Sequence, residues 1–93
     1  MRFNQIEYFL ELARVLNFTK ASKNLYISQP ALSKQIAGLE DQLGVKLFIR
    51  GNHTLSLTEA GVQLQRDLSD IWNRIESARN RVIEIGSKTA LAV

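Results

Sequence analysis

A short run of the chain carries most of the side chains that can recognise another molecule. It reads Ser28-Gln29-Pro30-Ala31-Leu32-Ser33-Lys34 and brings together two hydroxyls, an amide and an ammonium group. A glutamine amide can form two hydrogen bonds with the edge of an adenine, and a lysine can reach guanine O6 and N7 or a phosphate. Proline and alanine can make apolar contacts with a thymine methyl group. These residue types indicate that the run can contact DNA.

Charge is distributed unevenly around this run. Residues 12–39 contain four basic side chains and no acidic one, and residues 42–58 add two basic side chains, again without an acid. Together these stretches carry a charge of +6, whereas the rest of the chain carries −3 and the total is +3. A basic middle with an acidic remainder favours a polyanionic partner at one face. The alternative is a solvated surface whose asymmetry arose by chance.

Several other classes of protein are disfavoured. The chain has no cysteine, and its single histidine, His53, has no neighbouring metal ligands, so we expect neither a metal nor a cofactor. No nucleophile–base pair, phosphate-binding glycine loop or carboxylate cluster is present, so we expect no catalytic residues and no enzyme activity. No apolar run approaches the roughly 20 residues that span a bilayer, and no secretory signal begins the chain. We therefore expect a cytoplasmic protein.

Helices must position the polar run. Apolar residues at spacings of three and four predict a helix over residues 4–16, and Asn17 can cap a second helix over residues 18–26. A third helix is expected to begin after Ser28, which can cap it, and to end at Gly44, because glycine adopts the left-handed conformation easily. The polar run is thus the first part of the third helix.

Beyond residue 44 the period of the pattern changes to two. Residues 45–50 alternate, with Val45, Leu47 and Ile49 expected on one face, and residues 54–58 alternate again. Residues 51–52, Gly and Asn, supply a turn between them. We expect a small β-hairpin, with an irregular loop as the alternative.

A long helix is expected from Thr58 to Ile85, with Gly86 ending it. Its apolar residues repeat at spacings of three and four without interruption, in an a/d heptad seam. The helix would be about 42 Å long, which is more than a small domain can cover. We therefore expect it to dimerise, and the alternative is an amphipathic helix packed only on its own domain. The expected dimer contacts are Leu64, Leu68, Ile71, Ile75, Ala78, Val82 and Ile85.

These elements predict a mainly α fold, a winged helix-turn-helix of three helices and a two-stranded hairpin wing, followed by a long C-terminal dimerisation helix. Residues 1–58 would form the DNA-binding domain, 59–86 the linker helix, and 87–93 a linker to a missing effector domain. In such a fold the N-terminal residues of the second helix of the motif reach base edges in the major groove. Backbone N–H groups at the helix starts near Thr19 and Ser28 can hold phosphates.

The sequence also resembles a known family, the LysR-type transcriptional regulators. The helix-turn-helix of that family is matched by residues 18–36, from Phe18-Thr19-Lys20 through Ser28-Gln29-Pro30-Ala31-Leu32-Ser33 to Ile36. Its downstream pattern is matched, in order and spacing, by Leu39-Glu40, Leu43-Gly44, Leu47-Phe48, Arg50 and Leu57-Thr58-Glu59-Ala60-Gly61. The resemblance covers nearly the whole chain, from about Phe3 to Ile85.

The resemblance implies a bacterial regulator that binds inverted-repeat double-stranded DNA as a homodimer through the linker helix. It also implies tetramers of the full-length protein and a small-molecule effector bound only by a C-terminal domain, which this chain lacks. The expected DNA contacts are Thr19, Ser28, Gln29, Pro30, Ala31, Ser33, Lys34, Arg50 and His53. Two positions depart from the family pattern. His53 stands where many members have a wing arginine, and Lys34 replaces a common arginine by a more mobile point charge.

Two other functions remain open at this stage. The chain could be a protein-interaction module that uses the winged fold and the coiled coil without DNA, and a salt-sensitive shift of duplex DNA would exclude that reading. It could also be a different winged-helix regulator without an effector domain, which the length of the gene would decide.

Overall fold

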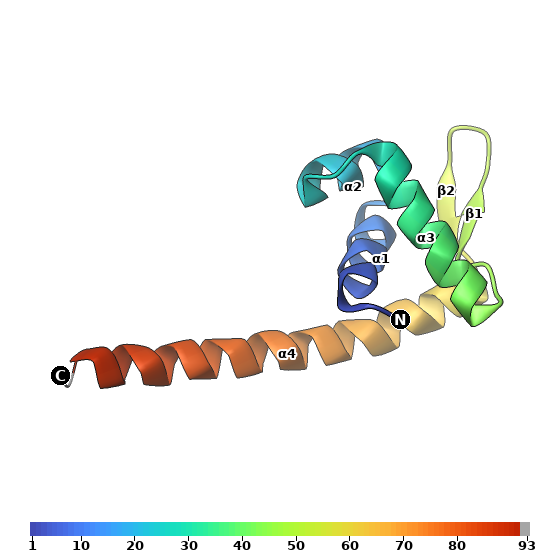
Figure 1. Ribbon diagram of the computed structural model, residues 1–93. Helices are drawn as coiled ribbons and strands as arrows, with labels where there is room; N and C mark the ends of the chain where they lie inside the picture. Colours follow the sequence, from blue (N-terminus) through green and yellow to red (C-terminus); the bar gives the residue numbers. More distant parts are fainter. Residues whose placement is uncertain (92–93) are drawn as a thin grey trace.

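A small helical domain sits on one half of a long helix whose other half projects away from it (Figure 1). The computed structural model describes the backbone of residues 1–91 and the side chains of residues 1–88. In chain order the elements are α1 (Phe3–Val15), α2 (Phe18–Leu25), α3 (Gln29–Leu43), β1 (Phe48–Arg50), β2 (Leu55–Leu57) and α4 (Glu59–Leu91). The helix-turn-helix α2–α3 followed by the β1–β2 hairpin is a winged helix-turn-helix, which confirms the predicted fold.

Local chemistry sets the helix boundaries. Asn17 Oδ1 accepts a hydrogen bond from the Lys20 amide at 2.9 Å and caps α2, and Ser28 Oγ accepts one from the Ala31 amide at 3.1 Å and caps α3. Gly44 follows α3 with a left-handed φ of 71°, as expected. Both caps and this stop are confirmed.

The first two helices each end one residue earlier than expected. Leu16 and Tyr26 adopt left-handed conformations, with φ of 51° and 57°, and leave their helices there. The amide of Leu16 still donates to the Leu12 carbonyl and that of Tyr26 to the Lys23 carbonyl, so the carbonyls at both helix ends are satisfied. Neither position is a glycine, and the sequence therefore carried no stop signal at either one.

The β-hairpin is confirmed, but the predicted face of its first strand is wrong. Phe48 is buried and pairs with Leu57, and Leu47 is also buried, whereas Val45 and Ile49, expected on the same face as Leu47, are 45% and 54% exposed. The reason is that the strand begins only at Phe48. Before it, the Leu47 amide donates to the Glu40 carboxylate at 2.7 Å instead of to a neighbouring strand, so residues 45–47 do not follow the alternation of a strand.

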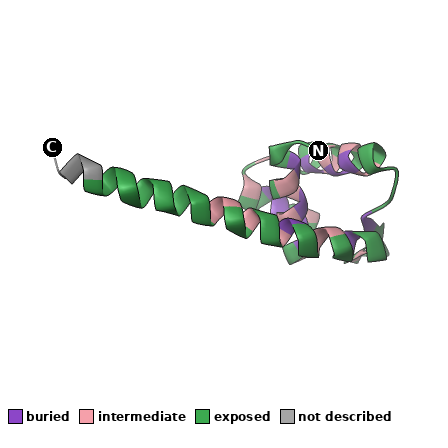
Figure 2. Cartoon of the chain, turned by 90° about the horizontal axis from the view of Figure 1, so that it is seen from below, coloured by how far each residue is buried: buried purple, intermediate pink, exposed green. Residues whose placement is uncertain are grey.

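The core lies where α1 and α3 meet α2, the hairpin and the start of α4 (Figure 2). Its centre is formed by Phe9, Leu12, Leu32, Ile36, Leu39 and Leu47, all fully buried. The ring of Phe9 packs on that of Phe48 with 5.5 Å between centroids and the planes tilted by 56°. This packing ties α1, the central helix of the domain, to the hairpin.

Helix α4 is packed on the domain only over its first part. Gly61 lies against the Leu47 carbonyl, Leu68 is 3% exposed, and Phe3 packs on Trp72 with 5.2 Å between ring centroids. Beyond this point the described residues are mostly exposed (Figure 2).

The expected end of the helix at Gly86 is wrong, because α4 continues to Leu91. A glycine inside a helix costs only about 1 kcal/mol relative to alanine, and no proline follows to stop it. The expected linker over residues 87–93 is therefore helical as far as Leu91, and its last two residues lie outside the described part.

Candidate nucleic-acid interface

The start of α2, the start of α3 and the hairpin loop meet at one end of the domain, opposite α4 (Figure 1). A shallow groove of about 430 Å³ runs between them, and its lining includes Phe18, Thr19, Gln29, Arg50 and His53. The structure thus brings side chains that were predicted separately, from two helices and the wing, to one surface.

Gln29, the first residue of α3, is exposed and is oriented by α2. The Thr19 hydroxyl donates a hydrogen bond to Gln29 Oε1 at 3.2 Å. The amide nitrogen of Gln29 keeps two donors and the oxygen keeps a second lone pair, so the side chain can still pair with an adenine. Thr19 itself is exposed near the N-terminus of α2.

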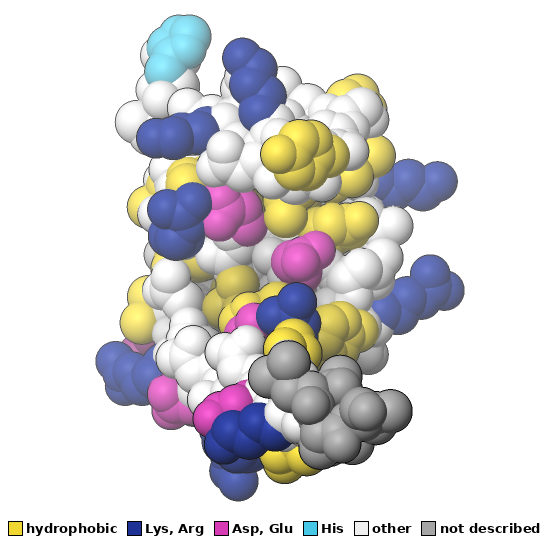
Figure 3. Space-filling view, turned by 90° about the vertical axis from the view of Figure 1, so that its left-hand side faces the viewer, with side chains coloured by type: hydrophobic (Ala, Val, Ile, Leu, Met, Phe, Trp, Pro, Cys, Tyr) yellow, Lys and Arg dark blue, Asp and Glu magenta, His cyan; other side chains and the backbone are white. Residues whose placement is uncertain are grey.

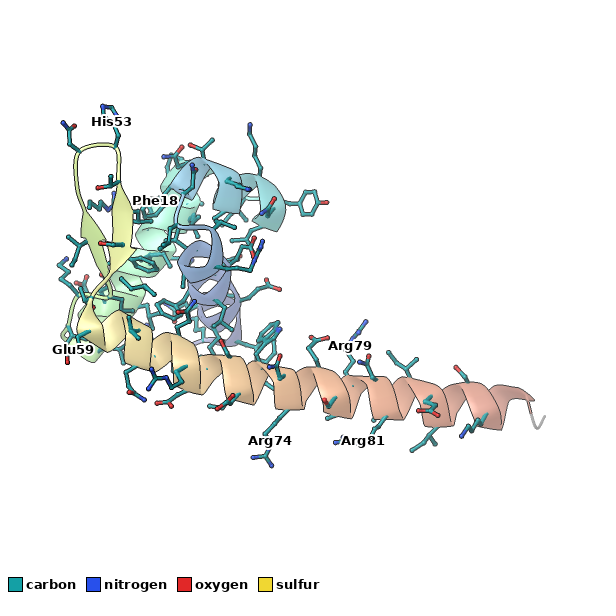
Figure 4. All side chains as sticks on the ribbon, turned by 180° about the vertical axis from the view of Figure 1, so that it is seen from behind. Phe18, His53, Glu59, Arg74, Arg79 and Arg81 are labelled. Atoms are coloured by element: carbon teal, nitrogen blue, oxygen red, sulfur yellow. The ribbon has the colours of Figure 1, made fainter. Side chains whose placement is uncertain are left out.

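Ser33 and Arg50 contact each other across the groove between α3 and the wing. Arg50 Nη2 donates to Ser33 Oγ at 3.1 Å, and the guanidinium carbon lies 4.4 Å from the centre of the Phe18 ring. This stacking is a cation–π contact. Figure 4 shows Phe18 between the hairpin and the start of α2.

The other predicted contacts are exposed on the same end of the domain. Pro30, Ala31 and Lys34 are all exposed on α3, while Ser28 uses its hydroxyl to cap that helix. His53 lies at the tip of the hairpin (Figure 4), where it adopts a left-handed φ of 60°. No predicted contact is buried in the core.

The electrostatics of this end favour an anion. In Figure 3 the upper end of the domain shows basic side chains and the histidine, and acidic side chains begin lower down. The ion pairs of the described residues involve Arg14, Lys46, Arg79 and Lys88, and none of these pairs includes Lys23, Lys34 or Arg50. Glu11 lies apart from the groove, and its pKa is lowered because Arg14 and, secondarily, Asn24 donate hydrogen bonds to its carboxylate.

Sequence reasoning missed three side chains that shape this site. Phe18 packs partly buried against the core, and its ring also supports Arg50. Thr19 was expected to supply a backbone donor, whereas its hydroxyl orients Gln29. Glu40 was not singled out, and its carboxylate accepts hydrogen bonds from the amides of Leu47 and Phe48 ahead of the hairpin. These contacts span 7 to 32 residues of chain, and no local pattern signals them.

The predicted seam of α4 divides into two parts. Leu68, predicted as a dimer contact, lies in the core of its own domain, and Leu64 packs against that core. Farther along, Ile71, Val82 and Ile85 are 48%, 69% and 64% exposed. Ala78 is also exposed, and Ile75 is half-buried. The exposed apolar part of the seam therefore begins at Ile71.

The described part of the chain has no group of side chains suited to a metal ion and no helix suited to a membrane. No group of three or more histidine, aspartate or glutamate side chains lies close enough to hold a metal ion there. Within the same part of the chain, no helix combines the length and the apolar character that crossing a membrane requires.

Comparison with known sequences gives a consistent result. A family model described as "Bacterial regulatory helix-turn-helix protein, lysR family" matches residues 3–62. The chain is 40% identical over 90 residues to the glycine cleavage system transcriptional activator of Escherichia coli (strain K12), covering 97% of this chain and 30% of that protein. It is 39% identical over 85 residues to the Hca operon transcriptional activator HcaR of the same strain, covering 91% and 29%. The chain thus spans less than a third of the length of these relatives, both of which are transcriptional activators.

Comparison with solved structures agrees with the comparison of sequences. The complex of BenM_DBD with catB site 1 DNA superposes with a TM-score of 0.87 at 30% identity, covering 94% of this chain and 97% of that chain. The complex of CbnR_DBD with DNA gives a TM-score of 0.82 at 32% identity, covering 92% and 99%. Both were solved bound to DNA.

Proposed function

Because this chain belongs to the LysR family of bacterial regulatory helix-turn-helix proteins, in which it is a DNA-binding domain, we propose that it binds inverted-repeat DNA as a homodimer. The observation that carries the proposal is the exposed start of α3. It lies beside the wing at the end of the domain where Lys34 and Arg50 take part in none of the ion pairs of the described residues. The α3 residues enter the major groove, and the wing approaches the neighbouring minor groove.

The proposed contacts divide by chemistry. Gln29, Ser33 and the apolar pair Pro30 and Ala31 face base edges, whereas Lys34 and the amides at the start of α2 hold phosphates. The imidazole of His53, at the wing tip, has fewer N–H donors than a guanidinium, so it adds less to phosphate binding than an arginine would. Residues 1–58 form the DNA-binding domain in this proposal, and α4 joins two such domains.

Selection of bound duplexes from a random pool tests this function. We expect enrichment of an inverted repeat with one fixed spacing between half-sites, because two identical domains related by a two-fold axis read identical sequences in opposite directions. Enrichment of a single half-site would contradict the dimer, and no enrichment at all would contradict sequence-specific binding.

The roles of Gln29 and Lys34 can be separated by a salt titration. Gln29→Ala is expected to cost about 1–3 kcal/mol per half-site on the selected sequence and little on random duplex, because it removes a base contact. Lys34→Ala is expected to weaken all sequences similarly and to make the slope of log affinity against log salt shallower by about one unit per half-site. A Lys34→Ala protein that loses sequence preference with an unchanged slope would assign Lys34 to a base.

The dimer can be tested at Ile71. We expect Ile71→Asp to shift the protein toward monomer at micromolar concentration in sedimentation, because pairing would bury an unpaired carboxylate. Ile71 is 48% exposed in the single chain, so the domain itself should tolerate the change. Asn80→Asp, at an exposed position off the seam, is the matched control and should remain dimeric. An Ile71→Asp protein that stays dimeric at every dilution would refute the seam.

A further inference from the structure

Arg50 connects the wing to both helices of the helix-turn-helix. It is the last residue of β1 and pairs with Leu55 of the other strand. Its guanidinium carbon lies 4.4 Å from the centre of the ring of Phe18, the first residue of α2, and its Nη2 donates to Ser33 Oγ in α3 at 3.1 Å. One side chain therefore bridges three elements.

These contacts hold Arg50 in a defined position before any ligand binds. The contact with the face of the Phe18 ring restricts where the guanidinium can lie, and the hydrogen bond to Ser33 restricts its rotation. None of the ion pairs of the described residues includes Arg50, so no carboxylate neutralises it. Only one of its N–H donors is used by Ser33, and the others stay available to a phosphate. Ordering the side chain in advance reduces the entropy lost on binding.

The contact also decides what Ser33 can offer to DNA. A serine hydroxyl has one proton to donate and two lone pairs to accept with. Arg50 occupies one lone pair, which leaves the proton free to point elsewhere. Ser33 is half-buried on α3, one turn after Gln29. It is therefore set up as a donor, suited to acceptors such as guanine N7 and O6, adenine N7 or thymine O4.

We propose that Arg50 is a positioning residue, which fixes the wing against α3 and orients the Ser33 hydroxyl so that the domain prefers certain bases. Its positive charge is a separate contribution, which adds affinity for every sequence alike. The proposal rests on the function proposed above, because base preference is what it explains. It differs from a simple phosphate contact, which would strengthen binding to every sequence alike.

Affinities for selected and random duplexes over a salt series test this role. Arg50→Lys keeps the charge but loses the planar stack and the fixed fork. We expect its salt slope to match that of the wild type, while its preference for the selected duplex falls about tenfold. Phe18→Leu, which removes the ring face and leaves Arg50 in place, should lower the preference in the same way. Arg74→Gln is the control for general charge loss, since Arg74 points away from the domain (Figure 4).

A double-mutant cycle shows whether Arg50 acts through Ser33. The double variant Arg50→Gln, Ser33→Ala should lose no more of the preference for the selected over the random duplex than Arg50→Gln alone does. The reason is that the second change removes a hydroxyl that has already lost its orientation. Melting curves of each variant confirm that the domain is folded at the temperature of the measurement.

Results that would contradict the role of Arg50 differ from those that would contradict the proposed function. Full preference in Arg50→Lys, or additive losses in the double variant, would show that Arg50 acts as an independent charge and would overturn the proposal. A wild-type protein without preference for any duplex would instead refute the proposed function, and that result comes from the wild-type arm alone.

Discussion

Gly61→Ala is expected to lower the free energy of unfolding by about 3 kcal/mol or more. A Cβ at this position would overlap the carbonyl oxygen of Leu47 and would lie 2.9 Å from Leu57 Cδ2. The Leu47 carbonyl cannot easily retreat, because it accepts the amide of Thr58 at 2.9 Å. Gly61 is thus the point where α4 meets the chain that leads into the wing. Chemical denaturation at a fixed protein concentration measures the effect.

Gly86→Ala provides the matched control for this variant. A Cβ at Gly86 would meet nothing within 4 Å, and the residue is inside α4. The same substitution is therefore expected to stabilise the helix by up to about 1 kcal/mol. Equal effects of the two substitutions, or a Gly61→Ala protein as stable as the wild type, would contradict the close approach at Gly61.

Phe9→Ala is expected to destabilise the domain by about 3–5 kcal/mol, which for a domain of this size leaves little stability. Phe9 is 0% exposed, and its ring packs on Phe48, so truncation leaves a cavity between α1 and the hairpin. Phe3→Ala is the comparison, since Phe3 is 57% exposed and loses mainly its contact with Trp72, worth about 1 kcal/mol. Thermal melts of both proteins distinguish the two. A Phe9→Ala melting temperature as high as that of Phe3→Ala would place Phe9 outside the core.

The features that sequence predicted well are those decided by nearby residues. Asn17 and Ser28 cap their helices through amides three positions away, and Gly44 needs only its own backbone freedom. The surface at the start of α3 was predicted for a related reason. Its polar residues follow a cap directly, so their place at the beginning of a helix was clear from local chemistry.

The features that sequence predicted wrongly or missed depend on distant residues. The inward face of β1 is decided by the Glu40 carboxylate, which delays the strand to Phe48. A heptad pattern shows which face of a helix is apolar but not which part of the protein covers that face. The sequence therefore could not distinguish burial of Leu68 in its own domain from a contact with a second chain. The stack of Arg50 on Phe18 joins residues 32 positions apart and has no counterpart in any local spacing.

The long helix α4 also couples the domain packed on its first part mechanically to its C-terminal end. Its first part is fixed to the domain at Gly61, Leu68 and Trp72, so the projecting part, residues 73–91, behaves as a lever about 28 Å long. A tilt of about 10° at the root of such a lever moves its tip by about 5 Å, which exceeds the rise of about 3.4 Å between neighbouring base pairs. In the proposed dimer, the stiffness of that root therefore governs how much variation in the distance between half-sites the protein tolerates.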